Sequence, residues 1–138
     1  MAVIGLGIMG DLFARIYKEL PQAELVALAD IDEKRVAKLG AELGVKGYTD
    51  YEEMLNDGDI DAVTICTPDQ LHLKPALAAA EAGKHMLIEK PIATTVEDGR
   101  RIIEATDSAG VKLMIAHCLR FDPRFAQGYE TIRRGDIG

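Results

Sequence analysis

Residues 1–10 read MAVIGLGIMG, a short apolar run followed by three glycines in the pattern G-x-G-x-x-G. After Gly10, apolar residues recur at the three- and four-residue spacing of an amphipathic helix. A second apolar run ends at Asp30, about 20 residues beyond the last glycine. A glycine-rich turn between a strand and a helix, followed by an acid after the next strand, predicts a βαβ unit that binds a dinucleotide.

The three glycines meet three separate physical demands. We expect Gly5 to allow a tight turn, Gly7 to let the backbone approach a pyrophosphate, and Gly10 to let the helix lie close to the strand. Free N–H groups and the positive end of the helix would then face the phosphates. Outside this context the same six residues could equally be a glycine-rich turn without a ligand, so the prediction depends on the strand, the helix and the acid together.

Asp30 indicates which dinucleotide such a unit would accept. Its carboxylate can accept hydrogen bonds from the adenosine ribose hydroxyls, and its negative charge would repel a 2′-phosphate, which favours NAD over NADP. Lys34 and Arg35 lie just beyond and leave NADP possible, unless they are simply a solvated helix face. The predicted cofactor-binding set also includes neighbours of the glycines and of the acid: Ile8, Met9 and Ile31.

The rest of the chain alternates short apolar runs with amphipathic stretches. The predicted strands cover residues 2–4, 24–29, 46–48, 60–66, 84–88 and 111–116. Short connections between alternating strands and helices force parallel pairing through right-handed crossovers. We therefore expect an α/β fold with a doubly wound, parallel six-stranded sheet of the Rossmann type, in the strand order 3-2-1-4-5-6.

Local signals place the helices within this frame. The first helix carries the apolar residues that we expect to form its buried stripe: Met9, Leu12, Phe13, Ile16 and Leu20. Asp32 is expected to cap the second helix, and Asp122 followed by proline to open the last one. Thr94 and Glu97 have the spacing of a capping box before the sixth strand, and residues 70–82 predict one alanine-rich helix.

Composition limits the classes of partner. At 138 residues the chain has the length of one domain. Its 16 basic and 23 acidic residues give a net charge of −7, which argues against a nucleic-acid partner because binding to phosphate backbones needs a basic face. The sequence has neither a basic, apolar export signal nor a long apolar run, so we expect no membrane contact and a cytoplasmic location.

Cysteines and histidines give no sign of a metal centre. Cys66 and Cys118 are expected to be reduced core thiols, because the sequence shows no export signal. Two strand spacings would separate them in the predicted sheet, too far for a disulfide. The three histidines, His72, His85 and His117, lack the paired spacing of a metal site. We therefore predict no metal ligands.

Polar residues follow the fourth and fifth predicted strands, where ligands of open α/β sheets bind. After the fourth strand come Thr67, Pro68 and His72, and after the fifth come Glu89 and Lys90. Taken alone, each segment could be turn chemistry, and His72 could be a satisfied helix residue. The same alternative applies to the arginine that follows strand six, Arg120.

Together these motifs resemble the Gfo/Idh/MocA-type family of oxidoreductases, named for glucose-fructose oxidoreductase and inositol dehydrogenase. The resemblance extends over residues 1–138, and EKP following T-P-x-x-x-H is more specific than the glycine motif. The matching elements are GLGIMG (5–10), AD (29–30), CTPDQLH (66–72), EKPIA (89–93), HCLRFDPRF (117–125) and RRGDIG (133–138).

This resemblance implies an N-terminal Rossmann domain that binds NAD or NADP in an enzyme whose substrates are usually sugars, polyols or related alcohols. By position, it implies that Thr67, Pro68 and His72 line the path to the nicotinamide. Glu89 would lie near the nicotinamide ribose, and Lys90 would be the catalytic-site lysine. An ammonium there can stabilise the oxygen of an alcohol as its proton leaves.

The chain also departs from the family pattern. Asp69 stands where an asparagine usually follows Thr-Pro, and Leu119 where an arginine often precedes Arg120. Residues 1–138 are interpreted as the dinucleotide-binding domain, with residues from about 121 onward forming a helix that leads toward an absent C-terminal substrate domain. This piece alone is expected to be inactive, and we expect the intact protein to bind a small sugar or polyol and to be a homo-oligomer.

Two alternatives compete with the enzyme interpretation. A non-catalytic module could bind a dinucleotide and signal by association. A methyltransferase that uses S-adenosylmethionine would share the glycine turn and the acid after strand two, but its chemistry has no need of Glu89-Lys90-Pro91.

Overall fold

The computed structural model of the chain describes residues 1–56 and 58–137. Its centre is a parallel sheet in the order β3-β2-β1-β4-β5-β6, which confirms the predicted topology. Four strands are shorter than the apolar runs that predicted them, because flanking residues such as Leu25 and Ile60 are buried without joining the ladder. The strands are β1 (Ala2–Ile4), β2 (Ala27–Ala29), β3 (Lys46–Tyr48), β4 (Ala62–Ile65), β5 (His85–Ile88) and β6 (Leu113–Ile115).

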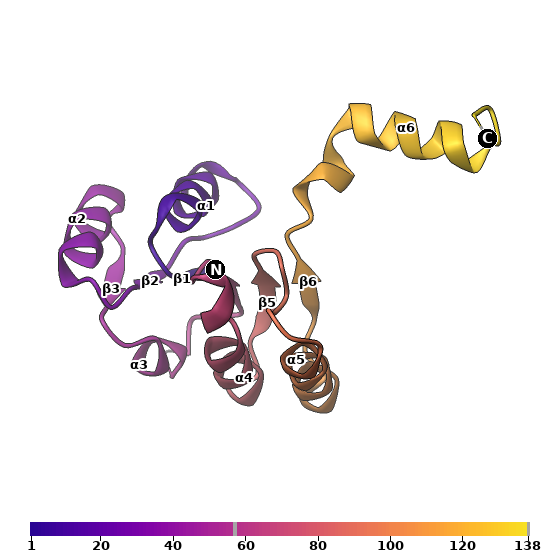
Figure 1. Cartoon of the computed structure of the whole chain (residues 1–138). Helices are drawn as coiled ribbons and strands as arrows, with labels where there is room; N and C mark the ends of the chain where they lie inside the picture. The colour runs from indigo at the N-terminus through magenta and orange to yellow at the C-terminus, as the bar shows by residue number, and fades with distance from the viewer. Residues whose placement is uncertain (57, 138) are drawn as a thin grey trace.

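Helices cover the sheet on both faces. Figure 1 shows α1 and α2 on one face and α3, α4 and α5 on the other. The change of face falls between β1 and β4, the switch point at which ligands of such sheets bind. The helices are α1 (Ile8–Glu19), α2 (Glu33–Leu43), α3 (Tyr51–Leu55), α4 (Leu73–Glu81), α5 (Val96–Ala109) and α6 (Pro123–Arg133), and two 3₁₀ turns are η1 (Asp69–Leu71) and η2 (Cys118–Phe121).

The strands supply two cores because successive side chains point to opposite faces. Val3 and Leu28 face α1 and α2, where they pack with Val36 and Leu39. The other core lies against α3, α4 and α5, and its fully buried residues include Ile65, Ile88 and Ile102. The near-continuous apolar strands are therefore explained by burial on both faces.

The predicted buried stripe of α1 is wrong. Gly10, Ala14 and Tyr17 form the buried face of this helix. The apolar residues beside that face are 40–47% exposed, except for the partly buried Phe13: Met9, Leu12, Ile16 and Leu20. Close approach of α1 to β1 requires small residues at the contact, and this requirement turns the larger apolar side chains away from the sheet.

Helix ends follow most of the predicted signals. Asp32 and Asp122 cap α2 and α6 as expected. The predicted Thr94 box is wrong by one residue, because Thr95 caps α5 and exchanges hydrogen bonds with Asp98. The sequence TTVED fits the capping pattern in both registers, so spacing alone could not choose between them.

The predicted helix over residues 70–82 is divided in two. Residues 69–71 form η1, and α4 begins only at Leu73. Between these elements lies His72, whose side chain is fully buried. Pro75 lies in the first turn of α4, where proline is tolerated because the N–H that it lacks would have no partner within the helix.

The last helix stands apart from the sheet. Figure 1 shows α6 projecting beyond β6 at one end of the molecule. Its apolar residues Phe125, Tyr129 and Ile132 are more than half exposed. Gly138, the last residue of the RRGDIG element, lies outside the described residues. None of the helices in the described ranges combines the length and the apolar character needed to span a bilayer.

A buried hydroxyl pair connects α1 to β4. The Tyr17 hydroxyl lies 2.6 Å from Thr64 Oγ1, and both side chains are buried. Tyr17→Phe would leave the Thr64 hydroxyl buried without this partner, so we expect the free energy of unfolding to fall by about 1–3 kcal/mol in urea titrations. In the Tyr17→Phe variant, Thr64→Val should lower the free energy of unfolding by less than it does in the wild type. Strictly additive losses from the two changes would contradict this account.

Candidate dinucleotide site at the carboxyl edge of the sheet

The turn after β1 is shaped by close backbone packing. Gly5 has φ +88°, and a Cβ there would lie 2.8 Å from backbone atoms of Cys66 and Thr67. A Cβ on Gly10 would overlap the carbonyl oxygen of Gly5. Both positions therefore require glycine for reasons internal to the fold, as the motif predicts.

Gly7 is different, because a Cβ there would meet nothing within 4 Å. It is the N-cap of α1, has an ordinary negative φ and provides no side-chain cap. The first N–H groups of a helix have no partner within it, so those of the first turn of α1 are available to a ligand. The fold itself does not require glycine at this position, whereas a phosphate group against the backbone would.

Asp30 joins the glycine turn to the end of β2. Its Oδ2 accepts a hydrogen bond from the N–H of Leu6 at 2.6 Å, and its Oδ1 accepts one from the N–H of Asp32 at 2.9 Å. A carboxylate has roughly four acceptor positions, so two remain for ribose hydroxyls. The carboxylate therefore holds the turn in place and keeps acceptor capacity for a ligand.

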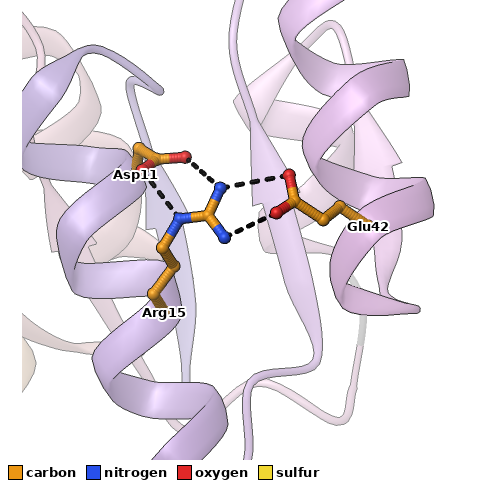
Figure 2. Close-up of polar contacts among 3 residues, drawn as sticks. All are labelled: Asp11, Arg15 and Glu42. Atoms are coloured by element: carbon orange, nitrogen blue, oxygen red, sulfur yellow. Dashed lines mark hydrogen bonds and ion pairs between the residues drawn. The ribbon is translucent and has the colours of Figure 1, made fainter.

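An ion-pair network that sequence reasoning missed fixes α1 against α2. In Figure 2 the Arg15 guanidinium lies between Asp11, one turn back on α1, and Glu42 on α2. It donates two hydrogen bonds to each carboxylate, at 2.7–3.1 Å. Hydrogen bonding to Arg15 lowers the pKa of Glu42 and raises that of Arg15 itself. The i,i+4 spacing gives a sequence signal for the Asp11 pair, but the contact with Glu42 depends on the tertiary fold.

Two residues after β4 face the glycine turn. Cys66 is partly buried, and burial together with the nearby carboxylate of Glu89 raises the pKa of its thiol to about 12. The thiol therefore stays protonated and unreactive at neutral pH. Within the described residues, the Thr67 hydroxyl oxygen is buried and has no hydrogen-bond partner. An orphaned hydroxyl on a residue whose backbone packs against Gly5 fits a polar ligand at this site.

Glu89 and Lys90 follow β5 at the same edge of the sheet. The Glu89 side chain is only 8% exposed, and its Oε2 accepts a hydrogen bond from the Lys90 N–H at 3.1 Å. Lys90 is exposed, and the peptide bond between it and Pro91 is cis. The Glu89 N–H continues the ladder to the Ile65 carbonyl oxygen at 2.9 Å, which places this segment beside the end of β4.

His72 lies between the loops that follow β4 and β5. The side chain is fully buried, and its ring lies between the carbonyl oxygens of Thr67 and Pro91. That it lines the path to the nicotinamide stays a prediction; the contacts of its ring are with backbone of the two loops.

The remaining predicted positions lie at different places along the edge. Pro68 is exposed after β4, and Ile8 and Ile31 are 89% and 93% exposed beside the glycine turn and Asp30. Arg120 lies in η2 after β6, which β5 separates from β4. The structure therefore gathers the β1, β2, β4 and β5 positions and leaves Arg120 at the far end.

A hollow of about 430 Å³ lies elsewhere, between α2 and β3. The carboxylates of Glu33 and Glu53 line it, and they would repel phosphates. This hollow is therefore a poor fit for a dinucleotide. Within the described residues, His, Cys, Asp and Glu side chains do not gather in groups of three or more that could hold a metal ion.

Comparison with known proteins decides the family. Residues 1–117 match the family model described as an oxidoreductase family with an NAD-binding Rossmann fold. The chain belongs to the Gfo/Idh/MocA family of oxidoreductases. Myo-inositol 2-dehydrogenase of Thermotoga maritima is 37% identical over 139 residues, which cover 100% of this chain and 42% of that protein. The chain thus spans about two fifths of the length of its curated Gfo/Idh/MocA relatives.

Solved structures of the Gfo/Idh/MocA family share the fold. The WlbA dehydrogenase of Bordetella pertussis, crystallised with NADH and UDP-GlcNAcA, is 30% identical with a TM-score of 0.93, over 99% of this chain and 42% of that one. Scyllo-inositol dehydrogenase of Lactobacillus casei, with bound NAD(H) and scyllo-inositol, is 28% identical with a TM-score of 0.92, over 99% and 41%.

Proposed function

We propose that residues 1–138 are the NAD-binding part of a longer oxidoreductase that acts on a polyol or sugar alcohol. The observation that carries this proposal is the open space at Gly7, beside uncapped helix N–H groups and on the same edge of the sheet as Asp30 and Lys90. NAD is the preferred cofactor, because the Asp30 carboxylate would repel the extra phosphate of NADP.

The adenosine half of the cofactor would lie over β1 and β2. The backbone at Gly7 and the first turn of α1 would hold the pyrophosphate, and Asp30 would accept hydrogen bonds from the adenosine ribose. Ile31 and Ile8 offer exposed apolar surface on either side, which suits contact with the flat adenine ring. The turn that Gly5 and Gly10 make possible keeps these groups in one place.

The nicotinamide half would lie toward β4 and β5. Bound there, NAD would accept a hydride from an alcohol carbon. Lys90 can donate a hydrogen bond to the substrate oxygen and stabilise the negative charge that develops on it as its proton passes to water or to a base outside residues 1–138, leaving a carbonyl product. The Thr67 hydroxyl, which has no partner among the described residues, would bond to the cofactor, and the largely buried Glu89 carboxylate would face the nicotinamide ribose. Pro68 and Arg120 are proposed as further contacts on this side.

The substrate class is inferred from relatives. Relatives of the chain include a myo-inositol 2-dehydrogenase and a scyllo-inositol 2-dehydrogenase, and an L. casei structure holds scyllo-inositol beside NAD(H). We infer a ring polyol or sugar, held largely by residues outside the present chain.

We also propose a cytoplasmic location. The exposed apolar faces of α1 and α6 support a homo-oligomer, which sedimentation of the intact protein would test.

The glycines provide a direct test of cofactor binding. Gly7→Ala meets no atom within 4 Å, so we expect almost unchanged thermal stability but at least tenfold weaker NADH binding in a fluorescence titration. Gly10→Ala overlaps the Gly5 carbonyl and should lower stability by roughly 1–3 kcal/mol. Equal NADH affinity in wild type and Gly7→Ala, or no saturable binding by wild type, would count against the proposal.

Lys90 is the test of the chemistry. In the intact enzyme, Lys90→Met should lower kcat for polyol oxidation by about 10²–10³, the usual cost of removing one charge-stabilising donor. NADH affinity should stay within twofold, because Lys90 acts on the substrate oxygen. Lys18→Met, in the last turn of α1 and away from the carboxyl edge, is the control and should leave kcat unchanged. A Lys90→Met enzyme with wild-type kcat would overturn the assignment.

A further inference from the structure

The loops after β4 and β5 leave the sheet side by side. The last backbone bond between these strands runs from the Glu89 N–H to the Ile65 carbonyl oxygen. Beyond it come Thr67 on one loop and Lys90 on the other, the two positions proposed to face the nicotinamide side. A regular ladder no longer fixes their separation, so other contacts must do so.

His72 provides such a contact. Its Nδ1 lies 2.8 Å from the carbonyl oxygen of Pro91, and its Nε2 lies 2.9 Å from that of Thr67. The side chain is fully buried at the junction of η1 and α4. One rigid ring therefore spans the two loops, and both of its nitrogens face backbone acceptors. Neither nitrogen is left to contact a substrate or cofactor.

We propose that His72 is a positioning residue, which holds the loop after β5 against the loop after β4 and so sets where Lys90 stands. The inference rests on the proposed function, because it assigns the nicotinamide end of the site to these loops. Pro91 directly follows Lys90, so a shift of the Pro91 carbonyl is transmitted to the lysine through one peptide unit. Displacements of about 1 Å are large enough to impair a reacting geometry.

Two conservative variants distinguish the contacts. The amide nitrogen of Asn in His72→Asn occupies a place similar to Nδ1 and can donate to the Pro91 carbonyl oxygen. The amide nitrogen of Gln in His72→Gln reaches further, toward the place of Nε2, and can donate to the Thr67 carbonyl oxygen. His72→Leu removes both ring nitrogens, and with them the contacts to the two carbonyl oxygens, while keeping an apolar volume in the buried site.

The test compares NADH with ADP, which lacks the nicotinamide and its ribose, on the full 138-residue chain. We expect His72→Leu to weaken NADH binding by about tenfold and ADP binding by less than twofold, because only the loops after β4 and β5 are displaced. His72→Asn should recover more NADH affinity than His72→Gln, since the Pro91 carbonyl anchors the loop after β5 that carries Glu89, the residue proposed to face the nicotinamide ribose. Ile102→Val, which trims the buried core on α5 without removing a polar group, is the stability control and should leave the affinity ratio unchanged.

Each outcome decides the matter. An NADH-to-ADP affinity ratio in the His72 variants within twofold of wild type would overturn the positioning role, as would the same change of ratio in Ile102→Val. If His72→Leu does not fold, the order of the Asn and Gln variants decides, and equal NADH affinities in those two would reject the proposal. Wild-type protein that binds neither ligand would instead refute the proposed function, and the role of His72 with it.

Discussion

The structure depends on the close approach of α1 to the end of β1. At this contact the Cβ of any residue other than glycine at position 10 would overlap the Gly5 carbonyl oxygen. Gly5 itself lies so near the backbone of Cys66 and Thr67 that the turn after β1 and the end of β4 form one packed unit. This packing aims the N-terminal end of α1 at the carboxyl edge, where its unpaired N–H groups can meet an anion.

The same contact explains which face of α1 is buried. Gly10 and Ala14 lie against the sheet because only small residues allow the approach, and Tyr17 then reaches Thr64 on β4. Arg15 joins Asp11 and Glu42 on the neighbouring side and holds α1 against α2. The glycine turn is thus braced from both directions, toward β4 through a buried hydroxyl pair and toward α2 through ion pairs.

Much of the fold could be predicted from the sequence, because continuous apolar runs, capping acids and the glycine motif each reflect a local constraint. Asp32 and Asp122 cap helices where expected, and the order of the strands follows from short right-handed crossovers. Contacts that depend on three dimensions could not be predicted in this way. The spacing of apolar residues alone predicted the wrong buried face for α1. That spacing does not show how closely the helix approaches the sheet at Gly10.

At the candidate site, too, the sequence predicted local features but not tertiary contacts. The position of a residue after a strand correctly predicted which edge it reaches, so Asp30, Thr67 and Lys90 share one edge. It could not show which side chains point outward. Lys90 is exposed, whereas His72 turns inward to two backbone carbonyls, and no spacing rule distinguishes these outcomes. A histidine seven residues after the end of a strand is consistent with either orientation.

The central claim is that one ligand lies along the carboxyl edge from β1 to β5. The most direct measurement is a titration of the isotope-labelled chain with NADH, followed by amide resonances in two-dimensional NMR. We predict that the amides of Gly7 and Ile8 shift together with those of Glu89 and Lys90 along one binding curve, while His85 at the opposite end of β5 stays unchanged. Shifts confined to the α2–β3 hollow, or unchanged Glu89 and Lys90 amides at saturation, would contradict the account.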